Sequence, residues 1–455
     1  MMKRYLLLYV VLLGMTRAFS QICFQKGNLW FEITSANTVS VFMKSACYSD
    51  PKIPATITFA GKQYTVTAIK SKGFGGDYYP RELAIPNTVT TIGDSIFVRG
   101  TMVESLTIPS SVTKIGTDAF LGARLKSLVV EEGNRFYDSR NNCNALIDSR
   151  TNTLLKGSNK AFIPNGVRRI ENYAFLWCDD IAEINMPNTV TDIGKGAFSS
   201  VPIGNIVLPN GLKTIGDHAF SGCSLCSLKI PASVTAIGKA AFAGNKISSI
   251  VVESGNKVYD SRNNCNAIIE TKTNTLLNAC QNTTIPNSVR TIGEYSFGFL
   301  RGLESVMIPA SVTEIKDCAF KTCRDLRDVK IMGTVNFGND CFVFCDSLKK
   351  MTYLTPLVLQ PVNLGGYCNI DTLYVLRDMV PMFKQTDLWK NIPNILPYTL
   401  PVDVNTDGIV NSTDVVALYN IIGKGGGDAE QKSRADVNGD GTINSADVVT
   451  VYNYI

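Results

Sequence analysis

The feature that most constrains this fold is an internal repeat. An apolar residue followed by proline recurs at intervals of 22, 23 or 55 residues, and a phenylalanine recurs with the same spacings. The apolar-proline pairs begin at Ile85, Ile108, Ile163, Met186, Leu208, Ile230, Ile285 and Ile308, and the phenylalanines are Phe74, Phe97, Phe120, Phe175, Phe198, Phe220, Phe242, Phe297, Phe320 and Phe342. The chain therefore contains about ten units, and a period of this length is typical of a solenoid.

One unit can be interpreted residue by residue. Leu106-Thr107-Ile108 alternates apolar and polar side chains, as a half-buried strand does, and proline then ends the strand because it cannot donate to a neighbour. Val112 and Ile115 are expected to point inward, Gly116 to permit a tight bend, and Phe120 to fill the interior. A single unit cannot bury its apolar face alone. We therefore predict that the units stack into a β-rich solenoid with a parallel sheet.

The two intervals of 55 residues contain related insertions. Residues 134–145 read NRFYDSRNNCNA, and residues 256–267 read NKVYDSRNNCNA. Each copy continues into two short apolar runs around a polar turn, which predicts a β-hairpin that leaves the solenoid. The insertion could be a ligand-binding projection or a structural strut, and its duplication does not decide between them.

The units resemble the BspA-like leucine-rich repeats, which are related to the treponemal type, through their Ile-Pro, Val-Thr-x-Ile-Gly and Ala-Phe motifs. The resemblance runs from about Val66 to Leu354, and the first units depart from it because Gly73-Phe74 and Ile96-Phe97 replace Ala-Phe. Members of this family are generally exported and are implicated in adhesion to host proteins or to other cells. The resemblance therefore implies a surface or secreted binding protein.

The N-terminus has the features of a signal peptide. Met1 to Arg4 carry two positive charges, an apolar run extends from Tyr5 to Met15, and Ala18-Phe19-Ser20 offers small residues for cleavage. The run is too short to span a bilayer as a helix, so we expect a secreted or cell-surface protein with no transmembrane segment after cleavage. Processing as a lipoprotein at Cys23 is an alternative, although Ile22 is not the small residue that it needs.

Alternating segments on both sides of the repeats are expected to cap the solenoid. Residues 21–64 alternate like β-structure, and a strand-like run around Leu373-Tyr374-Val375 precedes Trp389 near the other end. The predicted division is a signal peptide at 1–20, an N-terminal β cap at 21–65, a leucine-rich-repeat solenoid at 66–354, a C-terminal cap at 355–397 and a separate module at 398–455.

The chain has thirteen cysteines, which in an exported protein raises the question of disulfides. Cys178, Cys223, Cys323 and Cys345 each fall four residues after the first member of an Ala-Phe or Cys-Phe pair, and so at one position of the repeat. We interpret them as buried thiols, with disulfide bridges as the alternative. A zinc site is not expected, because His218 is the only histidine.

Two twelve-residue segments near the C-terminus match calcium-binding loops. Residues 403–414 read DVNTDGIVNSTD, residues 436–447 read DVNGDGTINSAD, and an apolar helical pattern follows each. Calcium takes about seven oxygen ligands, which such a loop supplies from side chains at positions 1, 3, 5, 9 and 12 and from the carbonyl at position 7. We therefore predict a small α-helical domain with two Ca²⁺ ions, whose ligands are Asp403, Asn405, Asp407, Ile409, Asn411, Asp414, Asp436, Asn438, Asp440, Thr442, Asn444 and Asp447.

The duplicated loop-helix arrangement resembles a type I dockerin, a module that plugs proteins into cohesins on a scaffold. The resemblance covers about Val402 to Ile455 and implies that loop positions 10 and 11 contact a cohesin-like domain, here through Ser412, Thr413, Ser445 and Ala446. The sequence departs from the family in its glycine-rich segment at 423–427. A calcium-stabilised terminal cap with no cohesin partner, or docking to another protein, therefore stays an alternative.

Charge and domain content narrow the functional class. The net charge of +5 is mild and no run of lysine or arginine occurs, so nucleic acid is not an expected partner. Repeats and caps leave no stretch for a catalytic domain, and His218 lies inside a repeat, so we predict no enzymatic activity. The expected function is binding or adhesion to a host or bacterial surface protein or to a glycan. A structural surface component and a dockerin-bearing polysaccharide-degrading enzyme are the alternatives.

Overall fold

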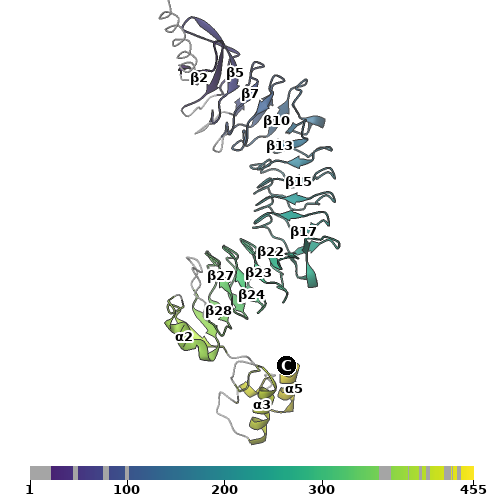
Figure 1. Cartoon of the computed structure of the whole chain (residues 1–455), viewed down its shortest axis with the longest axis vertical. Helices are drawn as coiled ribbons and strands as arrows, with labels where there is room; N and C mark the ends of the chain where they lie inside the picture. Colours follow the sequence, from purple (N-terminus) through teal and green to yellow (C-terminus); the bar gives the residue numbers. More distant parts are fainter. Residues whose placement is uncertain are drawn as a thin grey trace, which may run out of the picture. The chain divides into compact units, whose positions relative to one another are not determined.

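The computed structural model describes residues 22–44, 50–74, 81–97, 102–357, 370–387, 389–398, 402–405, 410–424, 432, 434–437 and 442–454. The chain divides into two compact units, one formed by residues up to 272 with 277–282, the other by residues 273–276 and those from 283 onward. Each unit is a parallel β-solenoid over its repeats, as predicted, and the succession of short strands is visible in Figure 1.

The predicted strands form a parallel ladder on one side of the repeats. Leu106 pairs with Leu128 and Ile108 with Val130, so that equivalent residues of successive repeats lie side by side and are buried. In the first unit these strands are β6 (Glu82–Leu83), β8 (Ser105–Ile108), β10 (Ser127–Val130), β17 (Ser227–Ile230) and β19 (Ser249–Val252). In the second unit they are β24 (Ser305–Ile308), β26 (Asp328–Ile331), β28 (Lys350–Tyr353), β29 (Thr372–Val375) and β30 (Asn394–Pro397).

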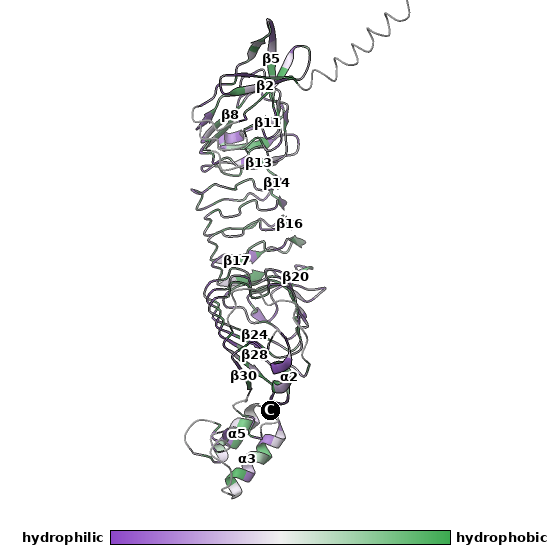
Figure 2. Ribbon diagram, turned by 90° about the vertical axis from the view of Figure 1, so that its left-hand side faces the viewer, coloured by the Kyte–Doolittle hydropathy of each residue, from purple (hydrophilic) through white to green (hydrophobic). Residues whose placement is uncertain are grey.

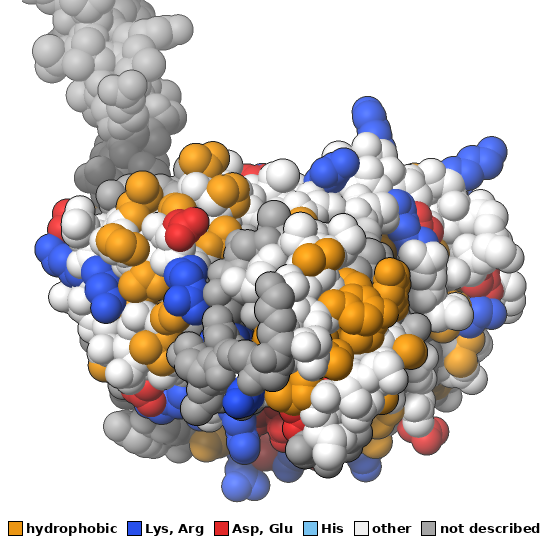
Figure 3. Space-filling model, turned by 90° about the horizontal axis from the view of Figure 1, so that it is seen from below, with side chains coloured by type: hydrophobic (Ala, Val, Ile, Leu, Met, Phe, Trp, Pro, Cys, Tyr) orange, Lys and Arg blue, Asp and Glu red, His pale blue; other side chains and the backbone are white. Residues whose placement is uncertain are grey.

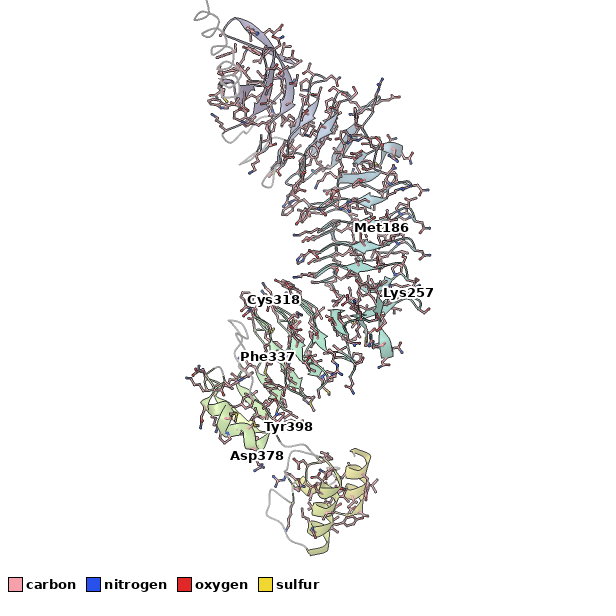
Figure 4. All side chains as sticks on the ribbon, in the orientation of Figure 1. Met186, Lys257, Cys318, Phe337, Asp378 and Tyr398 are labelled. Carbon is pink, nitrogen blue, oxygen red and sulfur yellow. The ribbon has the colours of Figure 1, made fainter. Side chains whose placement is uncertain are left out.

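A second parallel ladder, which the sequence pattern did not reveal, is formed by two-residue strands at the Thr-x-Ile segment. In the first unit these are β7 (Thr91–Ile92), β9 (Lys114–Ile115), β14 (Arg169–Ile170), β15 (Asp192–Ile193), β16 (Thr214–Ile215) and β18 (Ala236–Ile237). In the second unit they are β23 (Thr291–Ile292), β25 (Glu314–Ile315) and β27 (Asn336–Phe337). Phe337 of β27, labelled in Figure 4, is buried, and its ring packs edge-on against that of Tyr353.

Glycine follows these short strands because successive turns approach closely there. A Cβ atom at Gly194 would lie 2.6 Å from the backbone nitrogen of Asn172, and one at Gly216 would lie 2.6 Å from that of Lys195. At these two positions a side chain would clash unless the preceding turn shifted. The glycine that was expected to permit a bend thus also allows close packing between repeats, although Lys316 occupies the equivalent position after β25.

The third side of each repeat carries the recurring phenylalanines, which stack along the interior. The ring centroids of Phe175 and Phe198 lie 4.8 Å apart, and those of Phe198 and Phe220 lie 5.1 Å apart. All ten phenylalanines are buried, as predicted. Hydrophobic and hydrophilic residues follow one another around the repeats, as Figure 2 shows.

Both predicted hairpin insertions contain the same elements. The first consists of β11 (Tyr137–Asp138), η2 (Arg140–Asn142), β12 (Ala145–Asp148) and β13 (Thr153–Gly157), and the second of β20 (Tyr259–Asp260), η3 (Arg262–Asn264), β21 (Ala267–Glu270) and β22 (Thr275–Ala279). β12 and β13 are antiparallel, which confirms the hairpin in the first copy. The expectation that the hairpin leaves the solenoid is wrong for this copy, because β13 pairs in parallel with β14 of the next repeat and both strands are largely buried. Lys257 of the second copy is exposed (Figure 4).

The segments at both ends of the repeats join the ladders. At the N-terminal end, β1 (Cys23–Lys26), β2 (Leu29–Ile33) and β3 (Thr38–Phe42) are antiparallel, β4 (Thr56–Phe59) pairs with β5 (Lys62–Ile69), and β3 pairs in parallel with β5. At the other end, β29 and β30 extend the ladder, and η4 (Arg377–Met379) and α2 (Val380–Gln385) follow β29. Phe383 and Trp389 are fully buried there beside Tyr353.

Candidate functional site

The C-terminal segment contains two helices, α3 (Ser412–Lys424) and α5 (Ser445–Tyr454), each of which follows one of the predicted loops. Val415 and Leu418 of α3 and Val448 and Val451 of α5 share one buried cluster, as the repeated pattern predicts. Val402 and Val404 from the start of the first loop complete it. The helices are therefore held together by a small apolar core to which the first loop contributes directly.

The last residue of the first loop ties that loop to its own helix. Asp414 is fully buried, and its carboxylate accepts hydrogen bonds from the backbone N–H groups of Asn405 and Asn411, at 3.2 and 2.9 Å. Asn411 in turn accepts a bond from the N–H of Thr413, at 2.7 Å, which caps the start of α3. Asp403, at the first position of the loop, is also buried. Positions 3, 9 and 12 of the loop are thus joined by hydrogen bonds, and position 1 is buried.

The second loop repeats this arrangement. Asp447 is fully buried and accepts the N–H of Asn444 at 2.9 Å, and the side chain of Asn444 accepts the N–H of Ala446 at 2.7 Å. The amide of Asn444 also donates to the hydroxyl of Thr442, at 3.0 Å. Asp436, at the first position, is half-buried. The two loops therefore use equivalent residues in equivalent roles.

The donor set of these loops fits a calcium ion. Buried carboxylates and amide oxygens are the hard oxygen ligands that Ca²⁺ prefers, and full burial of Asp414 and Asp447 is costly without a compensating charge. Four of the twelve predicted ligands, Asp407, Ile409, Asn438 and Asp440, lie outside the described residues. Within the described residues, no group of three or more His, Cys, Asp or Glu side chains is close enough to hold a metal ion.

The predicted partner-binding residues lie on the exposed side of the module. Ser412, Thr413, Ser445 and Ala446 are all exposed at the starts of the two helices. One and two turns further along each helix, apolar residues are exposed as well: Val416 and Tyr419 at 58% and 56%, and Val449 and Tyr452 at 58% and 61%. The spacing i, i+4, i+7 places these residues with Ser412 or Ser445 on one helix face. We call these faces the two docking stripes, Ser412-Val416-Tyr419 and Ser445-Val449-Tyr452. The sequence alone does not distinguish these apolar residues from the core residues of the same helices, whereas their exposure in the structure does.

The solenoid offers a different kind of surface. The outward position of the four-residue strands carries exposed apolar residues, among them Val129, Val251 and Met307. At the end of the molecule that Figure 3 views from below, hydrophobic side chains also lie at the surface near lysine and arginine side chains. Such mixed surfaces on a rigid ladder are typical of repeat proteins that bind other macromolecules.

Comparison with known families matches both parts of the chain. The family described as BspA type leucine rich repeat region matches residues 17–146, 156–269 and 268–375, in six copies. The family described as Dockerin type I domain matches residues 401–455. A comparison with curated proteins found no match.

A comparison with solved structures found several matches. A leucine rich cell surface protein from Faecalibacterium prausnitzii shares 23% identity, with 84% of this chain and 96% of that one covered and a TM-score of 0.48. The pneumococcal vaccine antigen PcpA shares 19% identity over 83% of this chain and 99% of that one, with a TM-score of 0.39. A leucine-rich repeat protein from Bacteroides ovatus shares 20% identity over 73% and 94%, with a TM-score of 0.34.

The fold and the C-terminal loops thus define a leucine-rich-repeat solenoid that ends in a docking module. The chain belongs to the BspA type leucine-rich repeat family and carries a type I dockerin domain. Both domains are non-catalytic, the dockerin implies a cohesin-type docking partner, and type I dockerins generally bind calcium. Among the described helices, none combines the length and the apolar character that a membrane span requires.

Proposed function

We propose that this protein is an exported, non-catalytic adhesion protein whose solenoid engages a protein or glycan ligand, and whose calcium-loaded dockerin fastens it to a cohesin-like domain. The observation that carries the proposal is the pair of matching docking stripes, each beginning at the end of a predicted calcium loop. Both helices expose apolar side chains at matching positions, although other apolar residues of the same helices are buried in the module core. Exposed apolar residues in a repeated arrangement are typical of a protein interface.

Two calcium ions are part of this proposal. Asp403, Asn405, Asn411 and Asp414 would hold the first ion, and Asp436, Thr442, Asn444 and Asp447 the second, together with the four loop residues outside the described ranges. The ions would supply positive charge to two loops rich in carboxylates. Asp414 and Asp447 would then position Ser412-Thr413 and Ser445-Ala446, because each carboxylate lies at the first turn of its own helix.

The proposed division of labour keeps the boundaries expected from the sequence. A signal peptide at 1–20 would direct export, the caps at 21–65 and 355–397 would close the solenoid at 66–354, and residues 398–455 would dock. β5 crosses the first of these boundaries, and β29 and β30 extend the ladder into the C-terminal cap. The caps therefore act through continuous pairing with the repeats.

The docking half of the proposal is tested with the full mature chain on immobilised type I cohesins, in calcium and in chelator. We expect binding in calcium alone, and a loss of at least tenfold when Val416→Asp and Val449→Asp are combined, since both place a charge within the docking stripes. Val207→Asp is the matched control, because Val207 is 82% exposed on the solenoid. Absence of binding to every cohesin in calcium would contradict docking.

The solenoid half is tested by screening the same chain against host matrix proteins and glycan arrays. A ligand that survives chelation would support binding by the solenoid, since the calcium loops lie outside it. If no ligand binds while cohesin docking persists, a structural role on the surface replaces the adhesion role.

A further inference from the structure

The first insertion interrupts the contacts between successive repeats on the third side of the solenoid. In uninterrupted repeats, the residue two positions before each phenylalanine donates its N–H to the next turn, and the phenylalanine does the same. Tyr173 donates to Lys195, and Phe175 to Ala197, both at 2.8 Å. His218 and Phe220 donate in the same way to the turn that follows them. These bonds form a third backbone ladder along the phenylalanine stack.

This third ladder stops where the insertion begins. The equivalent donors are Asp118 and Phe120, and the N–H groups of both lack a hydrogen-bond partner among the residues that the structure describes. Asn172 lies on the far side of the gap. In the following turns the carbonyls at its position, those of Lys195 and Asp217, each accept an N–H from the preceding turn, but no described N–H donates to the carbonyl of Asn172. The next acceptor, the carbonyl of Ala174, is taken by the N–H of Gly157, at 2.8 Å.

The insertion closes the other two ladders with side chains. The hydroxyl of Tyr137 accepts the N–H of Ile115 at the edge of β9, at 2.9 Å. Asn144 and Ser139 accept the N–H groups of Leu128 and Val130 at the edge of β10, at 2.8 and 3.0 Å. Two of the three open edges are therefore satisfied within the chain, and only the third is left open.

A cavity of about 640 Å³ lies at the open edge, within the first unit. Residues 113–121 form one wall and residues 171–173 the other, and Tyr137 and Arg150 of the insertion line it as well. Its size falls within the range of about 300–1,000 Å³ that is typical of ligand sites.

Glu171 follows the first short strand after the gap. The same position holds Gly93, Gly116, Gly194, Gly216 and Gly238 elsewhere in the first unit, and a lysine at Lys70 and, in the second unit, at Lys316. The carboxylate folds back to accept the N–H of Asn172, at 2.9 Å, and pairs with Arg169 at 3.4 Å.

Two carboxylates line the gap and could pair with a basic side chain of a guest. Asp118 and Glu171 face the cavity from opposite walls, and burial together with the charge of Glu171 raises the pKa of Asp118 above its usual value. Three cationic side chains also line the cavity: Arg150 pairs with Asp148 at 2.6 Å, Lys156 donates to the carbonyl of Leu176 at 2.8 Å, and Lys114 is exposed.

We propose that this cavity binds a short segment of a partner protein that carries a lysine or arginine followed by a small residue, which pairs with the interrupted ladder as a missing turn would. This proposal rests on the proposed binding function and assigns one site to it. The guest would accept bonds from Asp118 and Phe120 through two carbonyls, and its middle N–H would donate to Asn172. Main-chain hydrogen bonds between a peptide and an open backbone edge are a common mode of peptide recognition.

The chain itself supplies a template for this guest. One repeat further on, Lys195-Gly196-Ala197 occupies the corresponding place: Lys195 and Ala197 accept bonds from the preceding turn, and the N–H of Gly196 donates to Asp217 at 2.8 Å. Gly196 has a φ of 56°, and Asp118 and Tyr173 at the same position have φ of 51° and 55°. The middle residue of the guest therefore needs left-handed backbone geometry, which favours glycine or asparagine.

The test uses the full mature chain and the acetylated, amidated hexapeptide Ser-Ala-Lys-Gly-Ala-Ser, followed by saturation-transfer NMR and by hydrogen exchange. We expect saturation transfer to this peptide, and protection of residues 117–121 and 171–173 from exchange. Replacing the peptide's lysine by glutamate, or its glycine by valine, should abolish binding. Asp118→Asn with Glu171→Gln should weaken it by about tenfold, since two charges are lost.

His218→Ala is the matched control, because His218 has the same register but its N–H is bonded to Lys239. Equal binding by the Asp118/Glu171 variant and the control would overturn the site, even if the chain binds cohesins or other ligands. A glycan whose binding the same variant removes, with all peptides inert, would overturn the peptide assignment. If the chain binds neither peptide, protein, glycan nor cohesin, the proposed function fails as well.

Discussion

The thiol of Cys223 donates a hydrogen bond to the carbonyl of Phe198, 3.1 Å away in the preceding repeat. Cys323 donates to Phe297 at 3.0 Å, and Cys345 to Phe320 at 3.1 Å. Each of these carbonyls also accepts an N–H from its own turn, those of Val201, Leu300 and Cys323, and the buried thiol adds a bond from the turn that follows. The recurring cysteines therefore hold successive repeats together through hydrogen bonds as well as by filling space.

Asn245 occupies the same position of the repeat and performs this role with an amide. Its Nδ2 donates to the carbonyls of Phe220 and Phe242, at 2.7 and 2.8 Å, and its Oδ1 accepts the N–H of Leu225 at 3.0 Å. Asn245→Ala should therefore destabilise the protein by about 3 kcal/mol, because three buried backbone groups lose their partner. Denaturant unfolding measures this, with exposed Asn210→Ala expected to change stability by less than about 0.5 kcal/mol. Equal effects of both changes would contradict the role of Asn245.

The thiols should differ sharply in reactivity. Burial raises the pKa of Cys223 to about 12 and that of Cys178 to about 11, whereas Cys226, three residues after Cys223, is exposed. Because the thiolate is the nucleophile, iodoacetamide at pH 8 should modify Cys226 in the native protein and leave Cys223 unmodified. Peptide mass spectrometry after timed labelling tests this, and both sites should react after denaturation without a reductant. Failure of Cys223 to react even then would reveal a disulfide.

The repeat architecture was predictable because its signals are periodic and numerous. The ten phenylalanines and the alternation in Leu106-Thr107-Ile108 identified the stack and one ladder, and the apolar pattern of α3 and α5 identified the module core. The second ladder was not predictable, since a strand as short as Lys114–Ile115 shows no alternation. The bond from Ile115 to the hydroxyl of Tyr137 was hidden as well, because it joins residues 22 apart through a side chain. The calcium ligands stay a prediction, since four of them lie outside the described residues.

Lys156 should make stability depend on pH. Burial lowers its pKa from 10.5 to about 8. Between pH 8 and 10.5 the unfolded chain therefore binds a proton that the folded protein does not, so this residue makes the folded state more stable as pH rises through that window. Lys156→Met should remove this rise. It should also stabilise the protein at pH 7 by about 2 kcal/mol, because the cost of burying the charge disappears while one hydrogen bond is lost.

Calorimetry of the Lys156 variant at pH 7 and pH 9.5 provides the measurement. Lys160→Met is the control, because Lys160 is exposed four residues away. A variant that is less stable than the parent at pH 7, with an unchanged pH profile, would show that the bond to the carbonyl of Leu176 outweighs the cost of burying the charge.

Calcium and folding should be coupled in the docking module. Eight acidic and three basic residues lie between Tyr398 and the C-terminus, and the buried carboxylates of Asp414 and Asp447 leave water when the module folds. The apolar core is small, so it offsets little of this repulsion and desolvation. We expect residues 398–455 of the chain to exchange amide hydrogens rapidly in chelator and to become protected in millimolar calcium, because binding free energy adds to folding free energy. The solenoid repeats should show the same protection in both conditions.

The two ions should be separable by substitution. Asp403→Ala or Asp414→Asn should lower the stoichiometry of calcium binding from two to one, because each removes a carboxylate of the first loop alone, and Asp436→Ala should do the same for the second loop. Titration calorimetry measures this, and Asp378→Asn is the control, since Asp378 is exposed outside the module. Ser412→Ala should leave both ions bound and weaken only the cohesin complex, because Ser412 is exposed and contributes no ligand. No uptake of calcium by the parent chain would rule out both the ligand assignment and calcium-dependent docking.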